Sequence, residues 1–282
     1  MDEKDVEKID ENVIVEETRK GNKKEKKQTK AGKIIDIIIS LVILVVCTAG
    51  LIFSGKELLN WVKNNFKSND LINEVNSLAG VSDVEENAAP GAEFGINFEA
   101  LIAYNPDVVG WIRIPGTGVN YSIVQADDNS KYLRHSIDLT WNEFGWPFMD
   151  YKNTPDFTDK NTVIYGHNIV SGLMFADLTN IYNGALGTDV EIDIYRSDYR
   201  LLTYKVFSSY VYDPENYYLT TNFINDEQYS TYLNTMLGRS VRDYNQDVSV
   251  DDTIITLSTC TSDSKRRIVV HAKLVSNTEM PR

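Results

Sequence analysis

The longest apolar stretch in the chain lies at 34–53 and is interrupted by a single charge, Asp36. About 20 residues of helix are enough to cross the roughly 30 Å hydrocarbon core of a bilayer. We therefore predict a transmembrane helix over residues 34–53. A cleaved signal peptide is the alternative interpretation, but its apolar region is usually shorter and closer to the N-terminus.

The residues that follow this run change from a helical pattern to a linker pattern. Apolar residues recur at near-helical spacing over 57–78, which predicts one or two helices. Residues 79–95 are small and acidic and include Pro and Gly, as is typical of a linker or an ordered loop. A short helix is predicted at 98–104. We therefore divide the chain into a disordered tail, a membrane helix, a helical segment with linker and a C-terminal domain, at 1–33, 34–53, 54–97 and 98–282.

Beyond residue 108 the apolar positions alternate, which is the pattern of β-strands. The first two strands form a predicted hairpin at 110–124. A helix at 226–237 interrupts the later strands. Many short strands joined by turns favour a closed barrel or a sandwich. The predicted strands lie at 109–114, 119–124, 146–150, 161–166, 188–195, 200–212, 253–260 and 267–275.

The charge of the chain is distributed unevenly. The formal net charge is −13, which argues against a nucleic-acid partner because phosphate binding requires clustered Lys and Arg. Residues 19–33, in contrast, are strongly basic. The positive-inside rule places this flank in the cytoplasm. We therefore predict a single-pass protein of the cell membrane, with a cytoplasmic N-terminus and an extracellular C-terminal domain.

Cys260 is the candidate nucleophile. The other cysteine, Cys47, lies in the predicted membrane helix, so Cys260 has no partner for an intramolecular disulfide. Alternation over 253–260 places Cys260 on the same polar face as Thr256 and Ser258. A buried structural cysteine is the alternative, and these polar neighbours argue against it.

The sequence contains 3 histidines, so there are few candidates for a histidine base. His167 follows the predicted strand 161–166, and Gly166 before it indicates a sharp bend that projects the ring from a strand end. His135 lies in a predicted helix or turn and is expected at the surface. His271 lies in the middle of the last strand, where a hydrogen-bonded structural role is expected. His167 is therefore the candidate base.

Arg267 opens the last predicted strand and is the candidate cation. A guanidinium can hold a substrate backbone or stabilise an oxyanion. Arg266 competes for the role, because a shift of one residue flips a strand side chain to the other face of the sheet. Ser258 and Thr259, beside Cys260, are candidate substrate contacts. The sequence has no metal-binding or phosphate-binding motif, so we expect neither a metal nor a cofactor.

Several motifs around these residues resemble the class B sortases. In chain order they are Asn105 to Gly116 (NPDVVGWIRIPG), Val163 to Asn168 (VIYGHN), Thr256 to Cys260 (TLSTC) and Arg267 to Lys273 (RIVVHAK). Asp128-Asn129, Tyr132-Leu133 and Phe148 to Asp150 extend the resemblance, which covers about residues 98–275. The cysteine motif alone is moderately specific, whereas all the motifs in this order behind an N-terminal anchor are highly specific.

The resemblance implies a mainly β fold, an eight-stranded barrel with peripheral helices that include N-terminal helices and one before the cysteine strand. It implies a membrane-anchored cysteine transpeptidase outside a Gram-positive cell, with Cys260, His167 and Arg267 as its catalytic residues. Such enzymes cleave a C-terminal sorting motif of secreted proteins, in class B commonly of the NPxTN type. They join the product to an amine of peptidoglycan or its precursor. The doubled arginine at 266–267 leaves the choice between its two members open, with Arg267 preferred.

Other functions would use some of the same residues. A plain cysteine protease uses the same Cys–His pair but hydrolyses its substrate without joining the product to an amine. A pilin-polymerising sortase differs in its nucleophile, which is a lysine of the pilin. A non-enzymatic surface module would keep Cys260 as a structural residue with an unreactive thiol.

Overall fold

The structure is a computed structural model that describes residues 29–81, 95–212, 216–260 and 266–280, with Cys260 described through its backbone only. Most of the predicted tail at 1–33 and of the predicted linker at 79–95 lies outside the described residues. The helices, including two short 3₁₀ helices, are α2 (Lys30–Ala79), α3 (Phe98–Tyr104), η2 (Lys131–Leu133), α4 (Leu178–Asn183), η3 (Tyr217–Leu219) and α5 (Asp226–Arg239). The strands are β1 (Val108–Arg113), β2 (Asn120–Val124), β3 (Phe148–Met149), β4 (Asn161–Tyr165), β5 (Glu191–Arg196), β6 (Arg200–Tyr212), β7 (Ile254–Cys260) and β8 (Arg267–Glu279).

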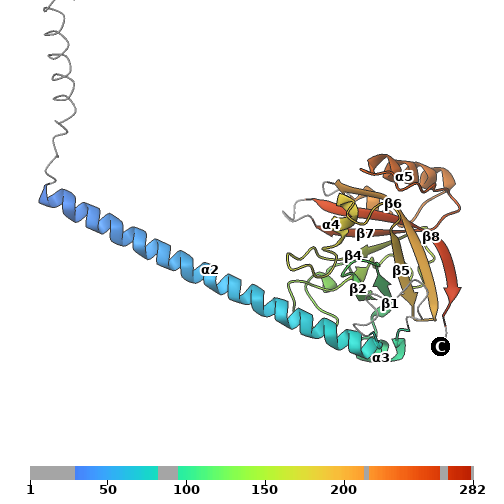
Figure 1. The fold of residues 1–282 in the computed structure, drawn as a ribbon, viewed down its shortest axis with the longest axis horizontal. Coiled ribbons are helices and arrows are strands. Elements are labelled where there is room, and N and C mark those ends of the chain that lie inside the picture. Colours follow the sequence, from blue (N-terminus) through green and yellow to red (C-terminus); the bar gives the residue numbers. More distant parts are fainter. Residues whose placement is uncertain (1–28, 82–94, 213–215, 261–265, 281–282) are drawn as a thin grey trace, which may run out of the picture. The chain divides into compact units, whose positions relative to one another are not determined.

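Within the described residues the strands close into a barrel in the order β1-β2-β3-β4-β7-β8-β6-β5, and β5 pairs back to β1. The β2–β3 and β4–β7 pairs are parallel, and the other pairs are antiparallel. The predicted hairpin at 110–124 is confirmed as the β1–β2 pair. The mainly β barrel with peripheral helices is confirmed as well (Figure 1).

Strands β8 and β3 differ most in length from their predictions. Strand β8 continues past 275 to Glu279, because its outer end pairs with the beginning of β6, where Arg200 lies opposite Glu279. Strand β3 is only the pair Phe148–Met149. Pro147, directly before β3, has no backbone N–H to donate to a neighbouring strand, which limits the pairing at this point. Its carbonyl oxygen still accepts a hydrogen bond from Val124 N at 3.2 Å.

Helix α2 is one continuous helix over the predicted membrane segment and the predicted helical segment after it. By length and composition it could cross a membrane, and its most apolar window is not buried in the structure. The chain divides into one unit up to Asn60 and a second from Trp61 onward. Within the second unit, the last turns of α2 bury Leu71 and Val75 in the core. Phe66 is exposed instead, as are Leu58 and Leu59 before it.

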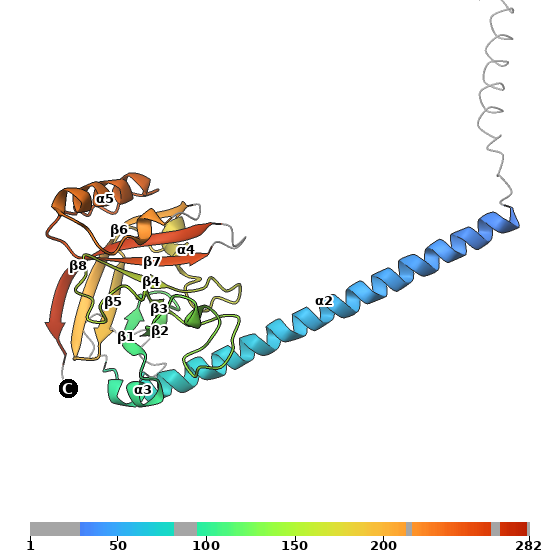
Figure 2. The same cartoon turned by 180° about the vertical axis from the view of Figure 1, so that it is seen from behind.

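Two apolar clusters lie on the two faces of the strands. The larger one fills the barrel and includes Ile255 and Leu257 of β7. The smaller one lies between the outer face of β6, β7 and β8 and the helices α5 and η3. Figure 2 shows α5 beside β6 on this side of the barrel. Alternation along the sequence placed Thr256 and Ser258 on the more polar face of β7, away from the core. Both side chains are buried, because α5 and η3 cover this face of the strand.

Candidate active site

The parallel pairing of β4 with β7 brings His167 to the end of β7. Tyr165 lies opposite Ser258 in this pair, and Gly166 N continues the contact by donating to Ser258 O at 3.2 Å. Both strands run in the same direction, so the residues that follow them emerge at the same edge of the barrel. His167, after β4, and Cys260, the last residue of β7, therefore meet at one edge.

The antiparallel pairing of β7 with β8 brings the candidate cation to the same edge. Arg267 lies directly opposite Cys260 in the strand register. Its side chain is partly buried and lines a cavity, whereas Arg266 is exposed and is not among the residues that line it. The Arg267 guanidinium also donates from Nη1 to Arg266 O at 3.3 Å. A guanidinium group thus stands at the end of β7.

A cavity of about 260 Å³ lies at this edge, and we call it the strand-end cavity. Its walls come from strand ends, from the segment around η2 and from η3. The lining residues are Asn129, Leu133, Phe148, Tyr165, Gly166, His167, Asn216, Tyr218, Leu219, Ser258, Thr259 and Arg267. The candidate base, the candidate cation and both candidate substrate contacts therefore share one cavity at the end of the strand that carries Cys260.

The ring of His167 is held by the backbone. Its Nε2 atom hydrogen-bonds the Leu133 carbonyl oxygen at 3.0 Å. Burial lowers the pKa of His167, and the positive charges of Arg134 and Arg267 lower it further, while the Leu133 carbonyl acts in the opposite direction. The surroundings thus favour the neutral ring, which can accept a proton.

Gly166 is required by packing. Its φ is not positive, and a Cβ atom at this position would lie 2.5 Å from Cγ of the Phe175 ring. Phe175 N in turn donates to His167 O at 2.8 Å. From the sequence, we interpreted this glycine as the sign of a sharp bend. The structure gives a different reason for a glycine at this position, because the Phe175 ring packs directly against the backbone that carries His167.

A buried carboxylate supports one wall of the cavity. Asp150 Oδ2 accepts hydrogen bonds from Tyr165 OH at 2.8 Å and from Asn129 Nδ2 at 2.9 Å. Its Oδ1 accepts from Lys152 N at 2.9 Å. A buried charge is tolerated only when it is hydrogen-bonded in this way. Burial, and then the charge of Asp150, raises the pKa of Tyr165, so its phenol stays neutral.

The two candidate substrate contacts have different hydrogen-bond environments. The Ser258 hydroxyl is 3.1 Å from Tyr218 OH, so it already has a partner. The Thr259 hydroxyl is buried and has no hydrogen-bond partner among the described residues. A buried hydroxyl without a partner carries a free-energy cost that a bound molecule can remove. Of the two hydroxyls, the one of Thr259 therefore has no partner among the described residues, and it is buried.

The other two histidines are placed elsewhere. His271 lies in the middle of β8, is fully buried and has partners at both ring nitrogens, as expected for a structural histidine. His135 follows η2, where its ring contacts Trp141 at 5.8 Å between ring centroids. It is partly buried, so the expectation of a surface position is only partly right.

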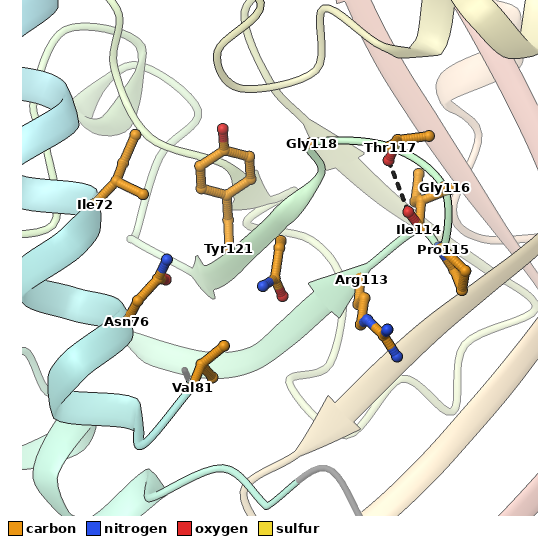
Figure 3. Close-up of a pocket in the computed structure, with 11 residues that line it drawn as sticks. Ile72, Asn76, Val81, Arg113, Ile114, Pro115, Gly116, Thr117, Gly118 and Tyr121 are labelled. Atoms are coloured by element: carbon orange, nitrogen blue, oxygen red, sulfur yellow. Dashed lines mark hydrogen bonds between the residues drawn. The ribbon is translucent and has the colours of Figure 1, made fainter. Parts of the chain in front are cut away.

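A second cavity, of about 150 Å³, lies beside the β1–β2 hairpin. Figure 3 shows Ile72 and Asn76 of α2 beside the strands that carry Arg113 and Tyr121. The turn is closed by the Thr117 hydroxyl, which donates to Ile114 O at 2.7 Å. The lining of this second cavity includes no cysteine or histidine. The chemistry expected of this chain therefore belongs to the strand-end cavity.

Sequence reasoning did not name several residues of the strand-end cavity as site residues. Asn129, Leu133 and Phe148 belong to motifs that carried the resemblance, so a signal was present without an assigned role. Tyr218 and Leu219 lie in the long insertion between β6 and β7 and had no such signal. They reach the cavity through η3, a tertiary arrangement that alternation and helical periodicity do not reveal.

Comparisons with known proteins agree with this geometry. The model of the sortase domain family matches residues 112–275. Sortase B of Listeria monocytogenes is 38% identical over 175 residues, which are 61% of this chain and 71% of that protein. Sortase B of Staphylococcus aureus is 34% identical over 181 residues, or 63% of this chain and 74% of that protein. The solved S. aureus sortase B–substrate complex has a TM-score of 0.64 at 28% identity, covering 76% of this chain and 99% of that one.

A closed barrel of this topology, together with these matches, defines a cysteine transpeptidase. The chain belongs to the sortase family. Its relatives are class B enzymes, and the chain is a class B sortase.

Proposed function

We propose that this sortase cleaves a C-terminal sorting motif of secreted proteins after a threonine and transfers the product to an amine of peptidoglycan or its precursor. The observation that carries the proposal is the meeting of His167, Arg267 and the strand end with Cys260 at one cavity. The motif is of the NPxTN type, as the class B resemblance implies. A substrate complex of the S. aureus relative supports a substrate site on this fold.

In the proposed mechanism, the thiolate of Cys260 attacks the carbonyl carbon of the threonine. Arg267 and backbone N–H groups stabilise the oxyanion that forms. The C–N bond then breaks, and the protonated ring of His167 gives its proton to the leaving amine, which leaves a thioester on Cys260. An incoming amine attacks this thioester, His167 removes its proton, and the C–S bond breaks to release the new amide and the thiolate.

Substrate contacts are proposed at Ser258 and Thr259. Both residues line the strand-end cavity next to Cys260 in the sequence. The buried Thr259 hydroxyl without a partner among the described residues supports a hydrogen bond to the bound peptide. Ser258 shares its hydroxyl with Tyr218, so its contact with substrate is expected to involve that phenol as well.

The placement at the membrane is a further part of the proposal. Residues 34–53 form the anchor, the tail 1–33 lies in the cytoplasm, and the catalytic domain 98–282 lies outside the cell behind the helical segment 54–97. The long apolar helix α2 and the basic residues at 19–33 support this orientation.

The test uses the full-length chain in detergent micelles with short sorting-motif peptides and two amines, triglycine and a lysine-bearing peptide. Mass spectrometry is expected to detect a peptide cut after its threonine and joined to an amine, and the Cys260→Ala variant is expected to give no product. Cleavage without joining would identify a hydrolase, and joining only to the lysine side chain would identify a pilin-type polymerase. Product formation by the Cys260→Ala variant would contradict the assignment of the nucleophile.

A further inference from the structure

The carbonyl oxygen of Leu133 is the acceptor for the candidate general base. His167 Nε2 lies 3.0 Å from it. A carbonyl oxygen only accepts hydrogen bonds, so Nε2 must carry a hydrogen in both the neutral and the charged ring. Nδ1 is then the nitrogen that is left to take up and release a proton. The tautomer of the base is therefore set by a backbone atom.

This carbonyl stands at the end of η2, which is fixed by its neighbours. The buried Tyr132 phenol donates to Asp107 Oδ2 at 2.7 Å and accepts from Asn105 Nδ2 at 2.9 Å. On the other side of the turn, Trp146 N donates to Tyr132 O at 3.0 Å. The backbone of this turn is thus held from two sides, and the Leu133 carbonyl has little freedom to move.

Gly145 lies directly against this turn. Its φ is +57°, and a Cβ atom at this position would overlap the Tyr132 carbonyl oxygen. The same Cβ atom would lie 2.9 Å from Leu133 O and 3.1 Å from Leu133 C. The neighbours are backbone atoms, which cannot rotate away as a flexible side chain could. Only a residue without a side chain leaves the carbonyl in its present position.

We propose that Gly145 and the Leu133 carbonyl form a positioning unit for His167, in which the missing side chain at 145 lets the carbonyl hold the ring in its Nε2–H tautomer and stabilise the charged ring. This inference rests on the proposed role of His167 as general acid and base. Neither Gly145 nor the Leu133 carbonyl is required to touch the reacting atoms.

The charges around the ring make this carbonyl important. The charges of Arg134 and Arg267 disfavour the protonated ring, as does burial, and the Leu133 carbonyl is the favourable contribution. Loss of the carbonyl contact is therefore expected to lower the pKa of His167 further. Among the described residues, the titratable or charged groups at this edge are Tyr165 of β4 with Asp150 behind it, Tyr218 of η3, Arg134 after η2 and Arg267 of β8. Cys260 stands at the end of β7.

The first experiment measures the tautomer in the unmodified protein. Full-length chain with ¹⁵N-labelled histidine gives ring signals from only 3 residues, and the His167→Gln variant identifies the signal of His167. At a pH where the ring is neutral, we expect a proton on Nε2 and none on Nδ1. A proton on Nδ1 would overturn the inference.

The second experiment compares Gly145→Ala with Gly187→Ala. Gly187 is a matched control, because its φ is +75° and a Cβ atom there would meet nothing within 4 Å. We expect Gly145→Ala to lower kcat/KM at least about tenfold relative to the control. Its KM should change little, and its His167 titration should move to lower pH. Equal titration midpoints in the two variants would overturn the inference.

These measurements also separate the inference from the proposed function. If Gly145→Ala does not fold, the tautomer of His167 in the unmodified protein still tests the inference, because a proton on Nδ1 would overturn it. Full turnover by His167→Gln would remove the proposed function and the inference together. An inactive His167→Gln variant, combined with an Nδ1–H tautomer in the unmodified protein, would remove the positioning unit alone.

Discussion

Two histidines of this barrel occupy opposite surroundings. His271, within β8, is fully buried, and its Nδ1 and Nε2 atoms are 2.9 Å from Thr256 Oγ1 and Tyr210 OH. His167, beyond the end of β4, lines a cavity and uses one nitrogen for the Leu133 carbonyl. A histidine that is satisfied at both nitrogens and sealed from solvent serves the fold. One that keeps a nitrogen beside a cavity can exchange protons with a substrate.

The electrostatics differ in degree between the two rings. Complete burial lowers the pKa of His271 to about 3, with a smaller contribution from the positive charge of Arg239. Burial also lowers the pKa of His167, but the carbonyl contact opposes the shift. The neutral state of His271 is therefore a condition of folding, whereas burial and the carbonyl contact act in opposite directions on the pKa of His167.

Exchanging each histidine for glutamine is expected to give the largest contrast. His167→Gln should lower kcat/KM about 10²- to 10⁴-fold, the range for loss of a general acid–base group, with a melting temperature close to that of the unmodified protein. His271→Gln should instead lower the melting temperature and leave kcat/KM of the folded fraction within about threefold, because its ring lies in the cluster beneath α5. Peptide turnover and thermal unfolding measure the two effects. A comparable loss of turnover in both variants would contradict the division of roles.

The pH dependence of stability is expected to report the buried ring. The pKa of His271 is lower in the folded chain than the ordinary value of 6.5, so the unfolded chain binds the extra proton between pH 6.5 and about pH 3. Its contribution to stability is fully present above pH 6.5 and is lost as the pH falls through this window, by up to about 1.4 kcal/mol per unit. In urea unfolding at a series of pH values, the free energy of unfolding should fall less steeply with falling pH for His271→Gln than for the unmodified protein. The same dependence of unfolding free energy on pH in both proteins would show that His271 does not titrate as expected.

Removing the cap of α5 is expected to give the smallest effect. The Asn225 side chain accepts from Gln228 N at 2.9 Å, and Asn225→Ala should lower the free energy of unfolding by about 1 kcal/mol. Asn97, which caps α3 by accepting from Ala100 N at 3.0 Å, offers a matched control. Both variants should keep full turnover of folded protein. A selective loss of turnover in Asn225→Ala would show that α5 also controls the cavity through η3.

The positions of most strands follow from local patterns, and the resemblance to class B sortases adds the closed barrel, whereas the cavity walls follow from neither. Strand β6 occupies the predicted range 200–212, because alternation reports which face of a strand is buried. Thr256 was placed correctly on the face opposite Leu257, but alternation gives no information on what covers that face. The covering residues come from the segment between β6 and β7, and their position depends on tertiary contacts such as Tyr232 OH donating to Tyr218 O at 2.7 Å.

The parallel pair β4–β7 has a consequence for how the chain folds. It joins Asn161 to Ile254 and Tyr165 to Ser258, residues far apart in the sequence. Such non-local pairing is slow, because the entropic cost of closing the long loop between the two strands comes before the contacts that offset it. A chain is also synthesised from its N-terminus, so β7 and β8 appear last. His167 thus reaches the end of β7 only when the barrel closes, and incomplete or partly folded chains are not expected to carry an assembled strand-end cavity.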